Sequence, residues 1–182
     1  WIIPLFTAGT AVGLATMVVY YLAKADIIDL NGQTQGILDV LVLGAATDYA
    51  LLLISRYREE LHHHESRYEA MKIALRGVVE PIVASGSTVI AGLMVLLLSD
   101  LSSNRGLGPV GSIGIAAAML AALTLLPALL IVFGRWIFWP KVPKFDDEDE
   151  KLSGMWAKVG NFVDRKPRAI WVTTALVLLI FA

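Results

Sequence analysis

The sequence has 182 residues, of which 57% are hydrophobic and only 17% are charged, and its mean hydropathy is +0.68. These values disfavour a soluble globular domain and favour a membrane protein. The sequence contains no cysteine, which excludes disulfide bonds and thiolate metal sites. Its net charge of −1 gives no indication of nucleic-acid binding.

Four apolar segments are long enough to cross a hydrocarbon core of about 30 Å, which takes about 20 helical residues. They are residues 2–23, 37–55, 81–99 and 107–134, and a further apolar segment covers 168–182. The expected fold is therefore an all-α membrane protein, with a polytopic bundle of transmembrane helices at residues 1–134. Because the last segment is shorter than a span, it is expected to be the start of a further transmembrane helix in a larger protein.

The charges of the connecting segments predict their orientation. The loops after the first and third apolar segments are not basic, whereas arginine and lysine residues crowd 56–80 and 135–168. By the positive-inside rule, these two basic connections lie in the cytoplasm. Apolar residues at helical spacing predict an interfacial helix in each, at about 60–80 and at 152–163. Residues 135–167 are then a cytoplasmic linker that carries the second of these helices.

One carboxyl group lies deep inside the second apolar segment. Asp48 is eleven residues from Ile37, or about 16 Å along a helix, which places it near the bilayer midplane. A charge at that depth costs at least about 2.5 kcal/mol, and such acids usually face a bundle interior or a water-filled cavity on an ion or proton path. Because burial disfavours the charged form of a carboxyl group, Asp48 is expected to bind and release protons.

Small and polar neighbours support an interior position for this carboxyl group. Gly44 and Ala45 lie one turn before Asp48 and are expected to let another helix approach closely. Tyr49 is rotated by about 100° from Asp48. Its hydroxyl can donate to a carboxylate or pass on a proton, so Asp48 and Tyr49 are the predicted proton relay.

Hydroxyl groups on the third apolar segment are candidate helpers of the relay. They belong to Ser85, Ser87 and Thr88. Such groups more often bond a backbone carbonyl or pack as small side chains, and that alternative stays open. Asp48 itself has a structural alternative, in which it only links helices through a hydrogen bond. Asp39 lies at the outer interface, where a solvated carboxylate is ordinary.

Other patterns have structural explanations. Residues 106–111 (GLGPVG) fit G-x-G-x-x-G, but no strand precedes them, so these glycines and Gly114 are expected to give a close helix contact. Pro109 is expected to start the helix, and Pro127 to kink the fourth segment. Three histidines at 62–64 point in different directions on a helix, which favours a solvated surface over a metal site.

The residues around Asp48 resemble a family signature. Residues 44–61, GAATDYALLLISRYREEL, are similar to the Gly-x-x-x-Asp-Tyr motif and the Arg-x-Arg-Glu-Glu-Leu exit of the MMPL (mycobacterial membrane protein large) proteins, a branch of the RND superfamily. The similarity continues through EAMKIALRGVVEPIVASGSTVIAGL at 69–93 and GLGPVGSIGIAAAMLAALTLLPALL at 106–130.

The resemblance implies a twelve-helix transporter that is driven by protons, of which this chain supplies helices three to six and the start of helix seven. Asp48 and Tyr49 would be one of two Asp-Tyr pairs, the other pair lying in the remainder of the same transporter. Periplasmic porter domains, also outside this chain, would handle a lipid-like or hydrophobic substrate. The implied setting is the bacterial inner membrane among its lipids, with protons as the coupling ion and with no cofactor, metal or nucleic acid.

Three alternatives remain open from the sequence. A related module of the SecD/SecF or sterol-sensing kind shares the helix layout, although the Asp-Tyr pair argues against it. A structural helix bundle without transport is the second. The third, an intramembrane aspartyl protease, needs two carboxylates in one site, and only Asp48 lies at midplane depth. The chain is therefore not expected to be an enzyme.

Overall fold

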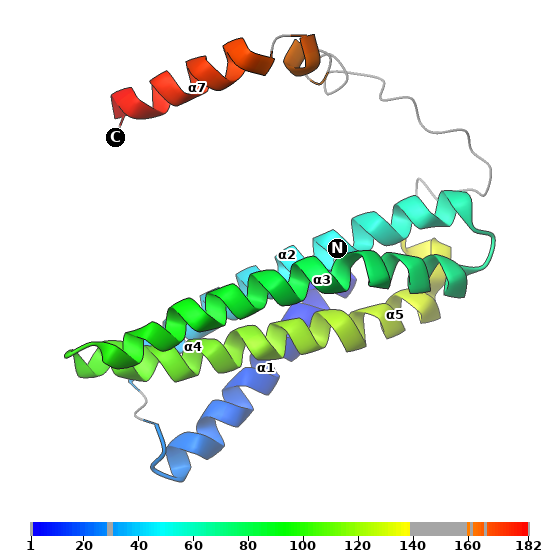
Figure 1. Ribbon diagram of the computed structural model, residues 1–182. Coiled ribbons are helices and arrows are strands. Elements are labelled where there is room, and N and C mark those ends of the chain that lie inside the picture. Colours follow the sequence, from blue (N-terminus) through cyan, green and yellow to red (C-terminus); the bar gives the residue numbers. More distant parts are fainter. Residues whose placement is uncertain (1, 29–30, 139–159, 161, 166, 182) are drawn as a thin grey trace. The chain divides into compact units, whose positions relative to one another are not determined.

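A computed structural model describes residues 2–28, 31–138, 160, 162–165 and 167–181. The chain divides into two compact units, Trp1–Asp146 and Asp147–Ala182. The first unit contains, in order, α1 (Ile2–Lys24), α2 (Gly32–His63), α3 (Arg67–Met94), η1 (Val95–Leu98), α4 (Ser102–Leu120), η2 (Ala121–Leu125), α5 (Leu126–Phe133) and η3 (Gly134–Phe138) (Figure 1). In the second unit, α7 covers Pro167–Phe181.

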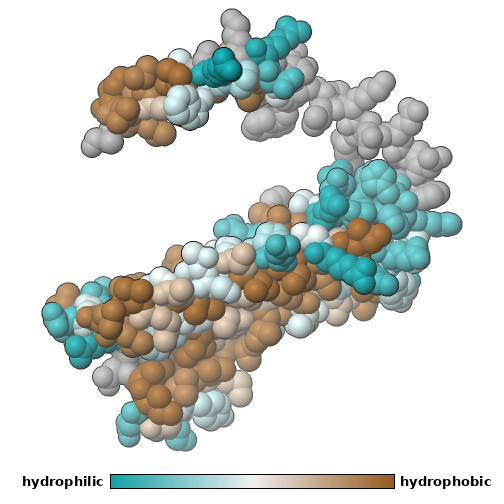
Figure 2. All heavy atoms as spheres, viewed as in Figure 1, coloured by the Kyte–Doolittle hydropathy of each residue, from teal (hydrophilic) through white to brown (hydrophobic). Residues whose placement is uncertain are grey.

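Four helical stretches of the first unit are long and apolar enough to cross a membrane, namely Ile2–Lys24, Gly32–His63, Arg67–Leu98 and Asn104–Phe133. Figure 2 shows hydrophobic side chains along the middle of these helices and hydrophilic side chains at their ends, as expected of segments that cross a bilayer. The predicted all-α bundle is confirmed, and the protein is a multi-pass membrane protein. The apolar part of α7, Ile170–Ile180, is shorter than a span. The predicted helix at 152–163 falls largely outside the described residues.

Helix α2 lies at the centre of the first unit. It packs against α1, α3 and α4, and α4 also packs against α1 and α3. Along α1, the side that meets this core carries small residues, among them Ala8, Ala11 and Ala15, all fully buried. Small side chains let helix backbones approach closely, which is how helices associate in lipid without a hydrophobic driving force between them.

Two glycines of α4 make close contacts with neighbouring helices. A Cβ added at Gly114 would lie 2.5 Å from Cγ2 of Val42 and 2.6 Å from Cδ1 of Leu38 on α2. A Cβ at Gly108 would lie 2.8 Å from the carbonyl oxygen of Leu93 on α3. Only glycine allows these approaches, so the expectation of a close helix contact at these glycines is confirmed.

The segment at 60–80 differs from the separate interfacial helix predicted from its periodicity. Residues up to His63 continue α2, and α3 then runs without a break from Arg67 through the membrane span. The apolar side of this segment is buried against the rest of the bundle, as the buried side chains of Leu61, Met71 and Val78 show. The periodicity therefore reflects packing between helix ends and not a helix lying on lipid.

Pro109 also differs from its predicted place at the start of a helix. Helix α4 begins at Ser102, so Pro109 lies inside it. A proline removes the hydrogen bond to the carbonyl four residues earlier, here that of Arg105. Arg105 is exposed in the first turns of α4, at the end predicted to lie outside, where water can bond its carbonyl. The helix tolerates the proline for that reason.

Pro127 follows a widened turn. The π-helical turn η2 joins α4 to α5, and the hydroxyl of Thr124 donates to the carbonyl of Leu120 at 2.5 Å. Pro127 cannot donate to Leu123 and its ring crowds that carbonyl. A π turn relieves this conflict while the span continues.

At its far end α5 stops at Gly134, whose φ of +59° is a conformation that residues with a side chain rarely adopt. The side chain of Arg67 lies beside Gly134, and its Nη1 donates to the carbonyl of Ile131 at 3.3 Å. A guanidinium at the negative end of a helix is favourable. This contact ties the start of α3 to the end of α5.

Replacing Gly114 with alanine is expected to destabilise the protein by about 1–3 kcal/mol, because the added methyl group must displace packed side chains of Val42 and Leu38. Thermal unfolding of the purified protein in detergent measures this change. Gly9→Ala is the matched control, since a Cβ at Gly9 meets nothing within 4 Å. Equal melting temperatures for the two variants would contradict the close contact.

Candidate functional site

Asp48 lies on the outside of the four-helix unit. Its side chain is exposed, whereas Ala46 and Ala50 are fully buried. Two residues along a helix correspond to a rotation of about 200°, so Asp48 projects from the side of α2 opposite to these alanines. The predicted interior position does not hold within this unit, because the helices packed here leave that side of α2 uncovered. No hydrogen bond or ion pair joins Asp48 to any residue that the structure describes.

Tyr49 lies on the inner side of α2. Its side chain is 8% exposed and belongs to the hydrophobic core. Adjacent residues on a helix diverge by about 100°, so the phenol ring packs among the four helices while the carboxyl group of Asp48 points away from them. The structure therefore places the two residues of the predicted relay on different sides of the same helix.

The exposed side of α2 carries a row of small and polar residues in line with Asp48. Gly44, Ser55 and Glu59 follow the same helical spacing as Asp48, and all are exposed. A Cβ added at Gly44 would meet nothing within 4 Å, so the close helix contact predicted there is not made by the described residues. Ala45, by contrast, is partly buried and packs against the core.

A matching row runs along α3. Nε of Arg56 would lie 3.5 Å from a Cβ at Gly77, so these two residues are neighbours in the antiparallel pair α2 and α3. Asp48 lies eight residues before Arg56 on α2, and Ser85 lies eight residues after Gly77 on α3. Asp48 and Ser85 therefore lie at similar depths. We call the exposed surface formed by the two rows the open face; it consists of Gly44, Asp48, Ser55 and Glu59 on α2 and Gly77, Pro81, Ser85, Thr88 and Gly92 on α3.

The three candidate hydroxyl groups differ in position. Ser85 is exposed at the depth of Asp48, and Ser87, two residues further, lies on another side of α3. The hydroxyl of Thr88 donates to the carbonyl of Ala84 in its own helix, at 2.8 Å. Thr88 thus follows the structural alternative, in which a hydroxyl bonds the backbone.

At the end predicted to be cytoplasmic, the open face ends in a hollow of about 320 Å³, lined by Leu52, Ser55, Arg56, Glu59, Gly77 and Val78. The guanidinium of Arg56 bridges two carboxylates there. Its Nη1 lies 2.7 Å from Glu59 and its Nη2 lies 2.8 Å from Glu60. The Glu60 side chain is only 8% exposed, whereas that of Glu59 is 58% exposed. We call these three residues the Arg56 cluster.

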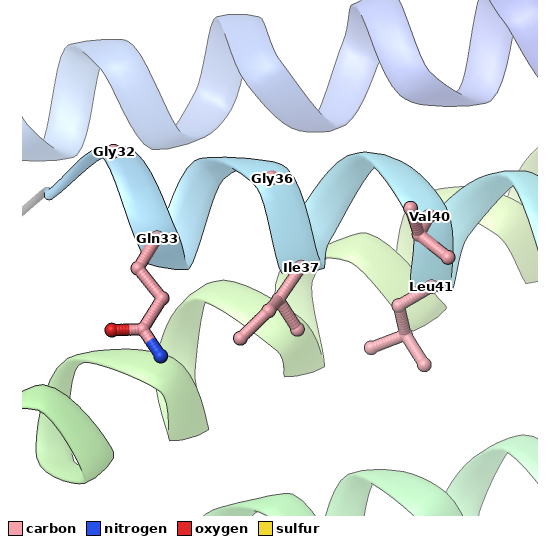
Figure 3. A pocket seen from close by; sticks show the side chains of 6 residues that line it. All are labelled: Gly32, Gln33, Gly36, Ile37, Val40 and Leu41. Carbon is pink, nitrogen blue, oxygen red and sulfur yellow. The ribbon is translucent and has the colours of Figure 1, made fainter.

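Sequence reasoning used the residues of this cluster only for topology and for the family resemblance. Their spacing contained a further signal, because arginine followed by glutamate three and four residues later predicts ion pairs on one side of a helix. An open groove of about 460 Å³ at the other end of α2 was also missed; it is lined by Gly32, Gln33, Gly36, Ile37, Val40 and Leu41 (Figure 3). Among the described residues, no group of three or more His, Asp or Glu side chains could hold a metal ion.

Residues 1–170 of the chain match the MMPL family. The chain belongs to the MMPL family. The membrane protein ActII-3 of Streptomyces coelicolor is 51% identical over 178 residues, a stretch that covers 98% of this chain and 25% of ActII-3. The apo-petrobactin exporter of Bacillus anthracis is 36% identical over 191 residues, covering 97% of this chain and 26% of that exporter.

The sulfolipid-1 exporter MmpL8 of Mycobacterium tuberculosis is 34% identical over 185 residues, covering 100% of this chain and 16% of MmpL8. This MMPL chain thus spans about a quarter or less of the length of these relatives. No solved structure matches it. The family match includes Asp48, Tyr49 and the Arg56 cluster, and it favours the MMPL interpretation over the SecD/SecF and sterol-sensing alternatives.

The Arg56 cluster of this MMPL chain predicts unequal effects of two substitutions. Arg56→Ala leaves the buried carboxylate of Glu60 without its guanidinium partner, which is expected to destabilise the protein by about 1–3 kcal/mol. Glu59→Gln removes only an exposed pair and is expected to change stability by less than about 1 kcal/mol. Thermal unfolding of the two purified variants compares them. A larger loss for Glu59→Gln would contradict the arrangement.

Proposed function

We propose that the full-length protein exports lipid-like or other hydrophobic molecules across the bacterial inner membrane, and that this chain is part of its proton-coupling transmembrane domain. The observation that carries the proposal is the exposed carboxyl group of Asp48, halfway along a membrane-spanning helix, on a face of small and hydroxyl residues. Two relatives that are named as exporters support the direction of transport, and the one named for sulfolipid-1 supports a lipid-like substrate.

The composition of the open face favours contact with protein over contact with lipid. Charged side chains at midplane depth are costly in hydrocarbon and usually face protein or a water-filled cavity. Gly44, Ser85 and Gly92 give the surface little bulk, which favours close approach of other helices. The partner in this proposal is the second half of the same transporter, whose own Asp-Tyr pair meets Asp48.

Coupling then follows from the charge state of Asp48. A proton that arrives from the outer side neutralises a carboxylate enclosed between the two halves, and its release toward the cytoplasm restores the charge. Tyr49 is packed in the core on the other side of α2, so a displacement of α2 at Asp48 is passed to the rest of the four-helix unit. Each proton that crosses a potential of 100 mV supplies about 2.3 kcal/mol. No cofactor is needed for this cycle.

Asp48→Asn is expected to abolish transport while the protein stays folded and inserted. The reason is that an amide, unlike a carboxyl group, cannot take up and release a proton during the cycle. Export and proton uptake by the full-length protein in proteoliposomes measure the effect. Asp39→Asn is the matched control: Asp39 lies on the same helix near its outer end and accepts a hydrogen bond from Nε2 of Gln35 at 3.0 Å. Proton-coupled export by a stably expressed Asp48→Asn variant would overturn the proposal.

Gly44→Leu tests whether the open face is covered by protein. Within this unit the new side chain meets no neighbour, so the fold of the four helices is expected to be unchanged. A partner that packs closely on the open face would be displaced, and export is expected to fall to the level of Asp48→Asn. Gly13→Leu, at an exposed glycine of α1, is the control. Normal export by the Gly44→Leu variant would indicate that lipid covers the face.

A further inference from the structure

We propose that the hollow at the Arg56 cluster is the cytoplasmic end of the proton route from Asp48, and that Glu59 is the relay residue at its mouth. This inference rests on the proposed function and names a residue and an exit that the Asp48 and Tyr49 pair does not supply. It follows from four features of the described structure: the row of polar groups on α2, the hollow itself, the backbone of α3 and the charges around Glu59.

The polar row runs from Asp48 toward the hollow, with the exposed side chain of Leu52 between Asp48 and Ser55. Ser55 lies about 10 Å from Asp48 along the helix axis, and Glu59 lies about 6 Å further. Both are on the open face with Asp48, and both line the hollow. The hydroxyl of Ser55 donates to the carbonyl of Leu52 at 2.9 Å, and its oxygen keeps lone pairs that can accept from water. At a hydrogen-bond spacing of about 2.8 Å, a chain of about three water molecules bridges the first gap and one water molecule bridges the second.

The hollow is large enough to hold that water. Its volume is about 320 Å³. One molecule of liquid water takes up about 30 Å³. The lining offers a hydroxyl, a guanidinium and a carboxylate from α2, which are the two to four polar partners that an ordered water requires. The hollow therefore has the room and the polar partners for a short chain of water molecules.

The backbone of α3 adds an acceptor on the other side of the hollow. Pro81 lies inside α3 and has no N–H, so the helical hydrogen bond from residue 81 to the carbonyl of Gly77 cannot form. Gly77 has no side chain to cover this region, and it lines the hollow. Its carbonyl can accept a hydrogen bond from water there.

The charges single out Glu59 as the group that exchanges protons with the cytoplasm. On α2, Glu59 pairs with Arg56, and Arg58, His62 and His63 lie one, three and four residues from it; on α3, the side chains of Lys72, Arg76 and Glu80 are exposed. Glu60 is buried, and its two carboxylate oxygens lie 2.8 Å from Nη2 of Arg56 and 3.8 Å from Nδ1 of His64. Glu59 also pairs with Arg56 but keeps more than half of its side chain in solvent. When Glu59 takes a proton, Arg56 retains Glu60 as its partner.

The step conserves charge and atoms. The carboxylic acid of Asp48 gives its proton to the adjacent water, a proton passes along the water chain by Ser55, and the carboxylate of Glu59 takes one up. Asp48 is then a carboxylate and Glu59 a neutral acid. Glu59 releases the proton to cytoplasmic water and returns to its ion pair with Arg56.

Glu59→Gln in the full-length protein is the first test. In proteoliposomes with an imposed pH gradient, proton release on the cytoplasmic side and export are expected to slow on the order of tenfold, with a raised solvent isotope effect, because water alone then carries the proton. Glu59→Asp is expected to restore most of the rate. Glu69→Gln, at an exposed carboxylate in the first turn of α3, is the control and is expected to match the wild type.

Gly77 provides a second test that leaves every titratable group in place. Alanine fits, because its Cβ would make an ordinary contact of 3.5 Å with Nε of Arg56. Leucine would fill the hollow, so Gly77→Leu is expected to slow proton release as much as Glu59→Gln, and the double variant to be no slower than either. Gly77→Ala is expected to retain the wild-type rate.

The outcomes separate the two proposals. Proton-coupled export by Asp48→Asn would overturn the proposed function, and the exit route with it. Loss of coupling in Asp48→Asn together with wild-type proton release in Glu59→Gln and Gly77→Leu would overturn only the exit route. Slow release in both of these variants, with normal release in Glu69→Gln and Gly77→Ala, supports it.

Discussion

On a membrane-spanning helix, a side chain either packs against neighbouring helices or stays available for chemistry. Two adjacent residues of α2 differ in this respect. Tyr49 is buried in the core, and Asp48 projects from the uncovered side. Because both residues belong to one continuous helix, a displacement of α2 as a whole moves the carboxyl group and the phenol ring together. The helices that pack against α2 surround Tyr49 and leave Asp48 uncovered.

The open face contains glycines that packing within the four-helix unit does not require. Glycine in the middle of a helix costs about 1 kcal/mol relative to alanine. On α4 that cost is offset by close contacts, as at Gly114. Gly44 and Gly92 make no such contact among the described residues, so nothing in this unit offsets their cost. A second surface that packs closely against α2 and α3 would offset the cost of these glycines.

The sequence predicted the four membrane-spanning helices well, because the length of an apolar segment and the bilayer thickness are enough to define a span. It could not predict which side of α2 faces the core. In a soluble protein hydrophobic periodicity would tell the sides apart, but in a membrane both are apolar: Val40 and Leu51 are exposed, and Leu38 and Leu53 are buried. For that reason the depth of Asp48 follows from the sequence and its direction does not.

The same limit explains the segment at 60–80. An amphipathic pattern near a membrane surface has two physical origins, contact with lipid and contact with a neighbouring helix, and the spacing of Met71 and Val78 fits both. Only the structure around the segment, here the end of α2, distinguishes contact with a helix from contact with lipid. The ion pairs of the Arg56 cluster, by contrast, depend on neighbours three and four residues apart and could have been predicted from local spacing alone.

The π turn η2 acts as a one-residue insertion in the fourth span. Each residue advances an α-helix by about 100°, but the wider π turn takes up the additional residue, so the residues after it keep their angular position. Leu126 and Leu130 thus face the core in continuation of Ala121 and Ala122. Without the wide turn, the additional residue would rotate those two leucines by about 100° away from the core, although the composition and length of the span would hardly change. The wide turn therefore keeps the second half of the span facing the core.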